Sequence, residues 1–202
     1  MNNDSEDESE NEMNHTKNVI PVYAKNFFTK IENYLNTKIY YFGSVQRNDY
    51  FFGDSDIDVC IFTSNESNTI LKLQNLLKKP KRVFRKIVNY LPTCKQIVYG
   101  YVVTYKNLKH NFSTDICIYD NKYKENVLKD NKFKIYLPFY ISFLLLIVKT
   151  LYYRLHLLSK PIYTYFKKLI MDILDDGDQF MNTRTNTWKF LVFEIPNVKM
   201  NK

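Results

Sequence analysis

The stretch FGSVQRNDYFFGDSDIDVCIF, residues 42–62, decides the fold. It follows a short β-branched and aromatic run at residues 38–42, which predicts a strand. Gly43 ends that strand, because a residue without a Cβ adopts turn dihedrals and lets a phosphate approach the backbone closely. Ser44 stands where a short helix is expected to begin, so its hydroxyl can cap that helix or bond a phosphate oxygen. This part of the stretch therefore predicts a phosphate-binding turn.

Asp56 and Asp58 lie one residue apart in the second part of the stretch, where an apolar run predicts a strand over residues 56–62. Side chains alternate faces along a strand, so the two carboxylates point the same way, about 7 Å apart. Such a pair suits hard divalent cations, which prefer oxygen ligands. The same pattern also fits exposed aspartates at a polar strand end, but the preceding Gly-Ser turn disfavours that alternative.

A third carboxylate is expected on a neighbouring strand, and residues 112–118 supply it. Asp115 alternates with Ile116 and Ile118, which point to the opposite face. Asp120 is the rival, but it falls just past the expected strand and precedes Asn121, which is typical of a turn.

These residues together, Gly43-Ser44, Asp56-Ile57-Asp58 and a later strand bearing Asp115, resemble the DNA polymerase beta nucleotidyltransferase superfamily. The resemblance implies that the three aspartates hold Mg²⁺ or Mn²⁺ and that Asp115 also activates the attacking hydroxyl. It implies that Gly43 and Ser44 hold the β- and γ-phosphates of a nucleoside triphosphate, for which we expect ATP.

A second resemblance concerns the C-terminal half. Residues 144–153 are similar to the helix that follows the catalytic domain in poly(A) polymerases and their uridylyl relatives, and Lys149 matches a lysine that reaches the triphosphate there. Residues 161–166 resemble the Ser-Tyr segment that opens their next helix, with Thr164 in place of the serine. Tyr165 is thereby implied to lie near the nucleotide. No nucleotide-recognition motif follows, so the base preference stays open.

The expected fold is α+β: a small mixed β-sheet nucleotidyltransferase core with helices on one face, followed by a helical C-terminal lobe. We expect a disordered acidic tail at residues 1–16, a catalytic domain at 17–134 and a mainly helical lobe at 135–202. The periodicity predicts helices at 21–36, 68–79, 137–158 and 161–175, with a continuation of the second helix over 83–91 and a helix stop at 175–178. Strands are predicted at 96–99 and 101–105, or as one long strand, followed by a turn at 107–110. The last predicted element is a strand or helix at 188–193.

The charge is unevenly distributed along the chain. The net charge is +8, and the first twelve residues hold six acidic residues and no basic one, so the remainder has 29 basic against 15 acidic residues. A basic body favours a polyanionic partner. A/T-rich codon usage is an alternative cause, since Lys, Asn, Ile, Tyr and Phe are all frequent. Residues 78–86 hold six basic residues in nine, which suits phosphate contacts, a nuclear signal or a solvated helix end.

The predicted reaction is template-independent transfer of a nucleoside monophosphate to an acceptor hydroxyl with release of pyrophosphate. RNA is the expected acceptor, through its 3′ end. One alternative is a minimal nucleotidyltransferase that modifies a protein, a tRNA or a small molecule. Another is a non-catalytic subunit that kept the fold, which the retention of all three carboxylates disfavours. A partner protein or a homodimer stays open.

Three cysteines without a CxxC pattern, Cys60, Cys94 and Cys117, predict free thiols in a reducing compartment. The apolar run at 135–148 is shorter than the roughly 20 residues that span a bilayer, so a buried helix is expected and no membrane partner. The acidic N-terminus lacks an apolar signal region. The expected location is cytoplasmic, with the nucleus as the alternative.

Overall fold

A five-stranded sheet forms the body of the molecule in this computed structural model, which describes residues 13–179 and the side chains of residues 13–171. The strand order is β1-β2-β5-β4-β3. β2 pairs with β5 in parallel and every other pair is antiparallel, so the sheet is mixed, as predicted. The strands are β1 (Tyr40–Phe42), β2 (Asp58–Thr63), β3 (Arg85–Leu91), β4 (Gln96–Asn107) and β5 (Phe112–Asp120).

Helices α2 (Val22–Leu35) and α3 (Glu66–Leu77) cover one face of the sheet. α2 begins after Pro21, where a missing N–H costs nothing, and ends at Asn36 in the left-handed conformation. α3 begins at Asn65, whose side chain accepts a hydrogen bond from the Asn68 N–H. Both helices therefore have local start or stop signals, and both confirm the predicted elements.

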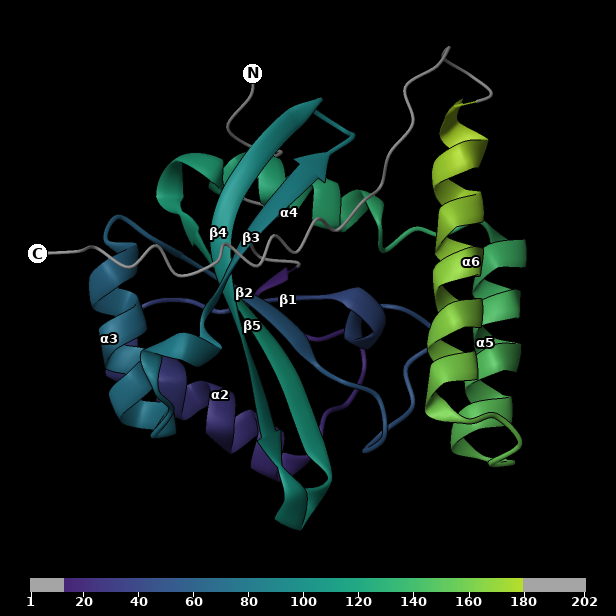
Figure 1. Cartoon of the computed structure of the whole chain (residues 1–202), viewed down its shortest axis with the longest axis horizontal. Helices are drawn as coiled ribbons and strands as arrows, with labels where there is room; N and C mark the ends of the chain where they lie inside the picture. The colour runs from purple at the N-terminus through teal and green to yellow at the C-terminus, as the bar shows by residue number, and fades with distance from the viewer. Residues whose placement is uncertain (1–12, 180–202) are drawn as a thin grey trace, which may run out of the picture.

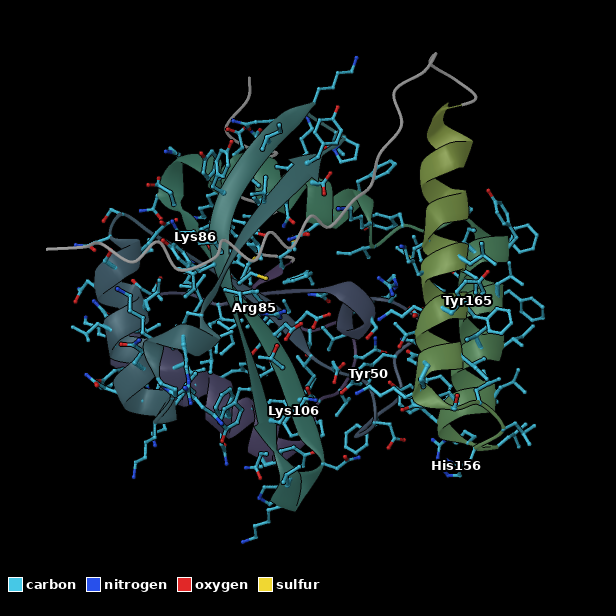
Figure 2. All side chains as sticks on the ribbon, viewed as in Figure 1. Tyr50, Arg85, Lys86, Lys106, His156 and Tyr165 are labelled. Carbon is cyan, nitrogen blue, oxygen red and sulfur yellow. The ribbon has the colours of Figure 1, made fainter. Side chains whose placement is uncertain are left out.

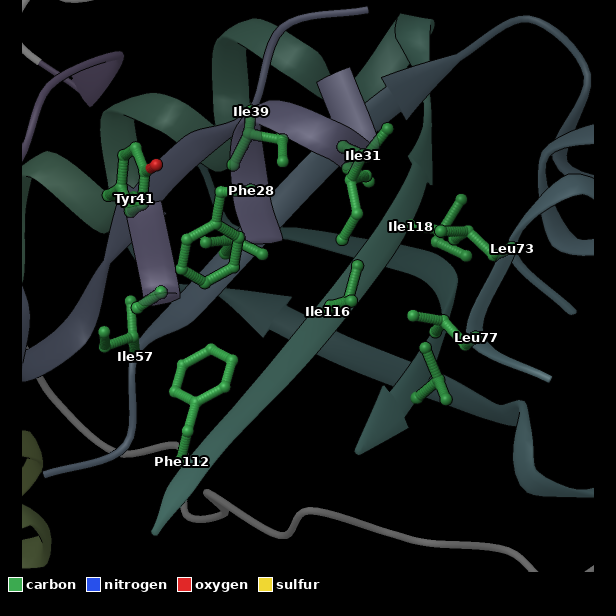
Figure 3. Close-up of a cluster of buried hydrophobic side chains, with 14 of the residues drawn as sticks. Phe28, Ile31, Ile39, Tyr41, Ile57, Leu73, Leu77, Phe112, Ile116 and Ile118 are labelled. Carbon is green, nitrogen blue, oxygen red and sulfur yellow. The ribbon is translucent and has the colours of Figure 1, made fainter. Parts of the chain in front are cut away.

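The main hydrophobic core lies between these helices and the sheet (Figure 3). Phe28 and Ile31 of α2 and Leu73 of α3 are fully buried against strand residues such as Ile116 and Ile118. Strand residues at every second position supply the sheet's side of this core, because a strand presents alternate side chains to each face.

The opposite face of the sheet is covered over only part of its length. Helix α4 (Lys124–Phe133), which the sequence analysis did not predict, packs Val127 and Leu128 on this face, and Met13 joins them. This second cluster contains Cys60 and Cys117, which are buried free thiols, as predicted. The expected helices on one face are thus present, and α4 adds a partial cover to the other.

The expected continuation of the second helix over residues 83–91 is wrong. α3 stops at Lys78 in the left-handed conformation, Pro80 follows, and residues 85–91 form β3 paired with β4. The β-branched and aromatic residues Ile87, Val88 and Tyr90 favour a strand. Residues 96–107 form one strand through Gly100, where a Cβ would meet the Ile118 carbonyl oxygen at 2.5 Å.

The C-terminal part is a helical hairpin of α5 (Phe139–Tyr153) and α6 (Lys160–Gln179), which stand side by side at one end of the sheet (Figure 1). α6 continues past the helix stop predicted at 175–178. Only one side of α5 is buried: Ile141 and Leu145 are covered, whereas Phe139 and Phe143 are 85% and 59% exposed. Over the described residues, neither these helices nor any other is long and apolar enough to cross a membrane.

The predicted division at residues 16 and 134 stays a prediction. Residues 1–12 of the acidic tail and the element expected at 188–193 lie outside the described residues. Met13 is fully buried, and the His15 carbonyl accepts a hydrogen bond of 2.6 Å from the Gln46 side chain.

Candidate active site

Asp58 and Asp115 are brought together by the parallel pairing of β2 with β5. The register pairs Val59 with Ile116, so the residues that precede them, Asp58 and Asp115, occupy neighbouring positions on adjacent strands. Both side chains lie on the sheet face opposite α2 and α3, because their neighbours in the chain point into the main core. Two carboxylates far apart in the sequence thereby share one site.

Asp56 belongs to the same group, although it precedes β2 and is exposed. Burial raises the pKa of Asp58 to about 6; the charge of Lys167 on α6 opposes this rise, and those of Asp115 and Asp56 add to it. The charges of Asp115 and Asp56 therefore act on Asp58, which places the three predicted carboxylates in one neighbourhood.

Gly43 lies directly against the carboxylate of Asp58. Its φ is +73°, and a Cβ placed there would come within 2.8 Å of Asp58 Oδ2. The predicted phosphate turn and the predicted aspartates are thus adjacent in space. Residues Gly43–Gln46 form a four-residue 3₁₀ turn rather than an α-helix. The turn is too short for a helix dipole, and phosphate binding by the Gly43 backbone and the Ser44 hydroxyl stays a prediction.

The donor set fits a hard divalent cation by its chemistry, since it consists of carboxylate oxygens that repel one another without one. The side chains are not preassembled: within residues 13–171, no three acidic, histidine or cysteine side chains converge as a metal-ligand cluster. Mg²⁺ usually takes only one or two carboxylates and completes its shell with water and substrate phosphate. Asp56, Asp58 and Asp115 as metal ligands stay a prediction.

Thr104 on β4 holds Asp115 in place. Its hydroxyl lies 2.6 Å from Asp115 Oδ1, and the register pairs the two residues directly across β4 and β5. This bond fixes one of the two carboxylate oxygens of Asp115. The sequence analysis missed this residue, although a polar side chain on a strand next to a carboxylate strand was the available signal.

Lys149 lies in a buried ion network. Its Nζ contacts Asp49 Oδ2 at 2.8 Å and the Asp49 carbonyl oxygen at 2.7 Å, and Arg47 binds the same carboxylate at 2.8 Å. Burial lowers the pKa of Lys149 to about 8, against the opposing charge of Asp49. Burial pushes the pKa of Asp49 up, but Arg47 and Lys149 together hold it below its usual range.

This network joins α5 to the loop that connects the Gly-Ser turn with Asp56. The contacts continue at Phe51, whose ring lies 5.6 Å from that of Tyr153 and 5.7 Å from the Arg154 guanidinium. The ammonium group of Lys149 thus binds Asp49, in the loop that leads to Asp56. Its role toward a triphosphate stays a prediction.

Tyr165 does not lie with the other predicted site residues. It is 64% exposed on α6, and its ring contacts Phe166. Tyr163, two positions earlier, is buried and stacks on Tyr152 at 4.2 Å. Burial raises the pKa of Tyr163, and the negative charges of Asp56 and Asp49 add to the rise. Tyr163 is thus the tyrosine of this segment that lies near the carboxylates, and helical spacing could have distinguished the two.

A surface hollow of about 530 Å³ lies elsewhere, on the outer side of α2. It is lined by Asn26, Thr29, Lys30, Asn33 and Tyr34. None of these residues lies on the sheet face that carries the aspartates, so this hollow is separate from the candidate site.

Comparisons with known proteins bear on most of the chain. The family model described as "Nucleotidyltransferase domain" matches residues 24–175. No curated protein matches. Among solved structures, the chain is similar to the RNA terminal uridylyl transferase Cid1 at 14% identity and a TM-score of 0.33, over 64% of this chain and 40% of that chain. The chain thus spans less than half the length of that structure, and no residue role is taken from it.

Proposed function

This chain belongs to the nucleotidyltransferase domain family, and we propose that it transfers a nucleoside monophosphate from a nucleoside triphosphate to the 3′ hydroxyl of an RNA chain. Family membership confirms the resemblance based on Gly43-Ser44 and the aspartates. The single observation that supports the reaction is the placement of Asp58 beside both Asp115 and Gly43. A carboxylate pair next to a phosphate turn is what a phosphoryl-group transfer needs.

Asp115 is the group proposed to receive or orient the proton of the attacking hydroxyl. The hydrogen bond from Thr104 fixes one of its oxygens, so the other keeps a defined direction. Asp56 and Asp58 would hold Mg²⁺ or Mn²⁺ together with Asp115, and a bound cation would lower the negative charge on the attacking and leaving oxygens.

Gly43 and Ser44 are proposed to hold the β- and γ-phosphates of the leaving group. Because Gly43 has no side chain, a phosphate can approach its backbone beside Asp58. Lys167 supplies a nearby positive charge from α6, as its effect on Asp58 indicates. The protein's contribution is then position and charge rather than covalent chemistry.

The test is a transfer assay with each of the four labelled nucleoside triphosphates, a short RNA, and Mg²⁺ or Mn²⁺. Asp58→Asn and Asp115→Asn should each lower RNA lengthening by on the order of 10³. Asp120→Asn is the matched control, because Asp120 lies on the same strand but on the opposite face, and asparagine keeps the oxygen that accepts the Lys122 N–H.

RNA lengthening that depends on Asp58 and Asp115 but not on Asp120 would support the proposal, and the preferred triphosphate, expected to be ATP, would follow from the same experiment. If the label is instead transferred to a protein, a tRNA or a small molecule, that molecule is the acceptor and not the RNA 3′ end. No transfer to any acceptor, with nucleotide still bound, would refute the proposed reaction and favour a non-catalytic subunit.

A further inference from the structure

The sheet face that carries the aspartates has a covered half and an open half. The covered half packs under α4 and Met13 through residues such as Val98, Val102 and Tyr119. Toward the other end of the strands, polar side chains replace the apolar ones. We call this region the open half, and it consists of Arg85 on β3, Thr104 and Lys106 on β4, and Ser113 and Asp115 on β5.

The strand register places these residues on one surface. Arg85 pairs with Val102, Thr104 with Asp115, and Lys106 with Ser113. Thr104 and Lys106 are two residues apart on β4 and share a face, and Val102 of the same face lies one step further along. Along the strand direction, the level of Asp115 therefore falls between that of Arg85, toward the covered half, and that of Lys106, toward the hairpin end, and β4 separates Asp115 on β5 from Arg85 on β3.

Arg85 and Lys106, both labelled in Figure 2, are exposed. Within the described part of the chain, neither side chain makes an ion pair or a hydrogen bond. Asp58 and Asp115 are the strand carboxylates on this half, and the site itself uses them. Arg85 and Lys106 thus present unpaired positive charge on β3 and β4, beside the strand that bears Asp115.

We infer that Arg85 and Lys106 bind the backbone phosphates of a single-stranded polynucleotide and so deliver its 3′ end to Asp115. The inference rests on the proposed function and names the residues that would recognise its acceptor. Arg85 and Lys106 are separated by four residues along β4, from Val102 to Lys106, which is roughly 13 Å. Two exposed cations spaced in this way along the sheet suit a chain that carries repeated phosphates.

The chain itself supplies a matched control. Lys86 follows Arg85 directly and points to the opposite face, where it pairs with Tyr101. Lys30 is exposed on α2, also on that opposite side. Lys30→Ala/Lys86→Ala removes the same charge as Arg85→Ala/Lys106→Ala but leaves the open half intact.

The experiment measures binding of a fluorescein-labelled 12-nucleotide RNA by anisotropy at several salt concentrations, without nucleotide or turnover. The logarithm of the RNA association constant falls linearly with the logarithm of the salt concentration, and each lost phosphate contact to a single strand reduces the magnitude of that slope by roughly 0.7. Arg85→Ala/Lys106→Ala should therefore reduce the magnitude of the slope by about 1.4 and weaken RNA binding at low salt. The control double variant should match the wild type in both respects. Circular dichroism verifies that both variants remain folded.

The transfer assay gives the second measurement. In Arg85→Ala/Lys106→Ala, the KM for RNA should rise while the KM for the triphosphate stays unchanged, because neither side chain is placed at the phosphate turn. An unchanged salt slope, or an equal loss in the control variant, would overturn the inference. Equal binding of an acidic peptide with the same dependence on Arg85 and Lys106 would also overturn it.

These outcomes are distinguishable from failure of the proposed function. If the salt dependence of RNA binding changes in Arg85→Ala/Lys106→Ala but no acceptor is lengthened, the polynucleotide-binding surface is supported and the proposed reaction is refuted. If RNA is lengthened but neither the salt dependence of RNA binding nor the KM for RNA changes in the double variant, the reaction is supported and the polynucleotide-binding surface is refuted.

Discussion

The sheet and the α5–α6 hairpin differ in how completely their apolar residues are buried. In β2 and β5, core-facing residues such as Val59, Ile116 and Ile118 alternate with residues of the opposite face and are fully buried. α5 has no charged residue between Phe139 and Val148, yet its outward side remains open to solvent. An alternating pattern thus specifies which side is covered, whereas a uniformly apolar helix does not.

The largest expected effect separates stability from activity inside the sheet. Asp58→Asn should lower nucleotidyl transfer by on the order of 10³. The same substitution should raise the free energy of unfolding at neutral pH by about 1–3 kcal/mol, because burial has raised the pKa of Asp58 from 3.8 to about 6, and a charged carboxylate is disfavoured there. Urea unfolding beside the transfer assay measures both. A less stable variant would contradict the electrostatic account of this site.

The sheet core should respond strongly to loss of volume. Ile116 is fully buried in the main core (Figure 3). Ile116→Ala should lower the free energy of unfolding by about 4 kcal/mol, the range for such truncations being roughly 2–5 kcal/mol. A loss below about 1 kcal/mol, measured by urea unfolding, would show that the sheet core is not tightly packed around Ile116.

The ion network between the two regions should have an intermediate effect. Lys149→Met leaves Asp49 buried with Arg47 as its remaining partner. Removing one partner of a buried pair costs roughly 3–5 kcal/mol, and the retained Arg47 favours a value of about 3 kcal/mol. If instead the variant is as stable as the wild type, the hairpin does not depend on this network. Thr150→Val, one position later and more exposed, serves as the control.

Lys149 should also give the junction a characteristic pH dependence. Burial lowers its pKa to about 8 in the folded chain, against a usual value of 10.5. Below pH 8, Lys149 is protonated in both the folded and the unfolded chain. Between pH 8 and pH 10.5 the unfolded chain binds more protons at this side chain than the folded chain does, so the contribution of Lys149 to the free energy of unfolding rises with pH. The wild type should therefore gain about 2 kcal/mol over Lys149→Met between pH 8 and pH 10. A constant difference would contradict the lowered pKa.

The smallest effect is expected on the outer side of α5. Phe139 is 85% exposed, so Phe139→Ser should change the free energy of unfolding by less than about 0.5 kcal/mol. Ile141→Ala, two positions later and fully buried, should cost about 2–5 kcal/mol. If both substitutions destabilise the protein to a similar degree, the outward side of α5 is covered in solution and the contrast with the sheet disappears.

The sheet elements around the site are predictable from the sequence because their signals are local. Gly43 after a strand, and the alternation around Asp58 and Asp115, are enough to place these two carboxylates on strands. The strand at 85–91 is harder to predict, because Pro80 and a run of basic residues also suit a helix that continues after a break. The network of Arg47, Asp49 and Lys149 is not predictable in this way, since its members meet only after α5 packs against the loop.

β2 and β5 are neighbours in the sheet, but α3, β3 and β4 lie between them in the chain. During synthesis on the ribosome, β2 emerges well before β5, and closing the long segment between them costs entropy before any contact repays it. Asp58 and Asp115 therefore become neighbours only once this late strand is inserted. A nascent chain that ends before Phe112 carries the Gly-Ser turn and the first two aspartates without the third. The order of translation thus makes completion of the sheet the moment at which the full set of carboxylates first exists.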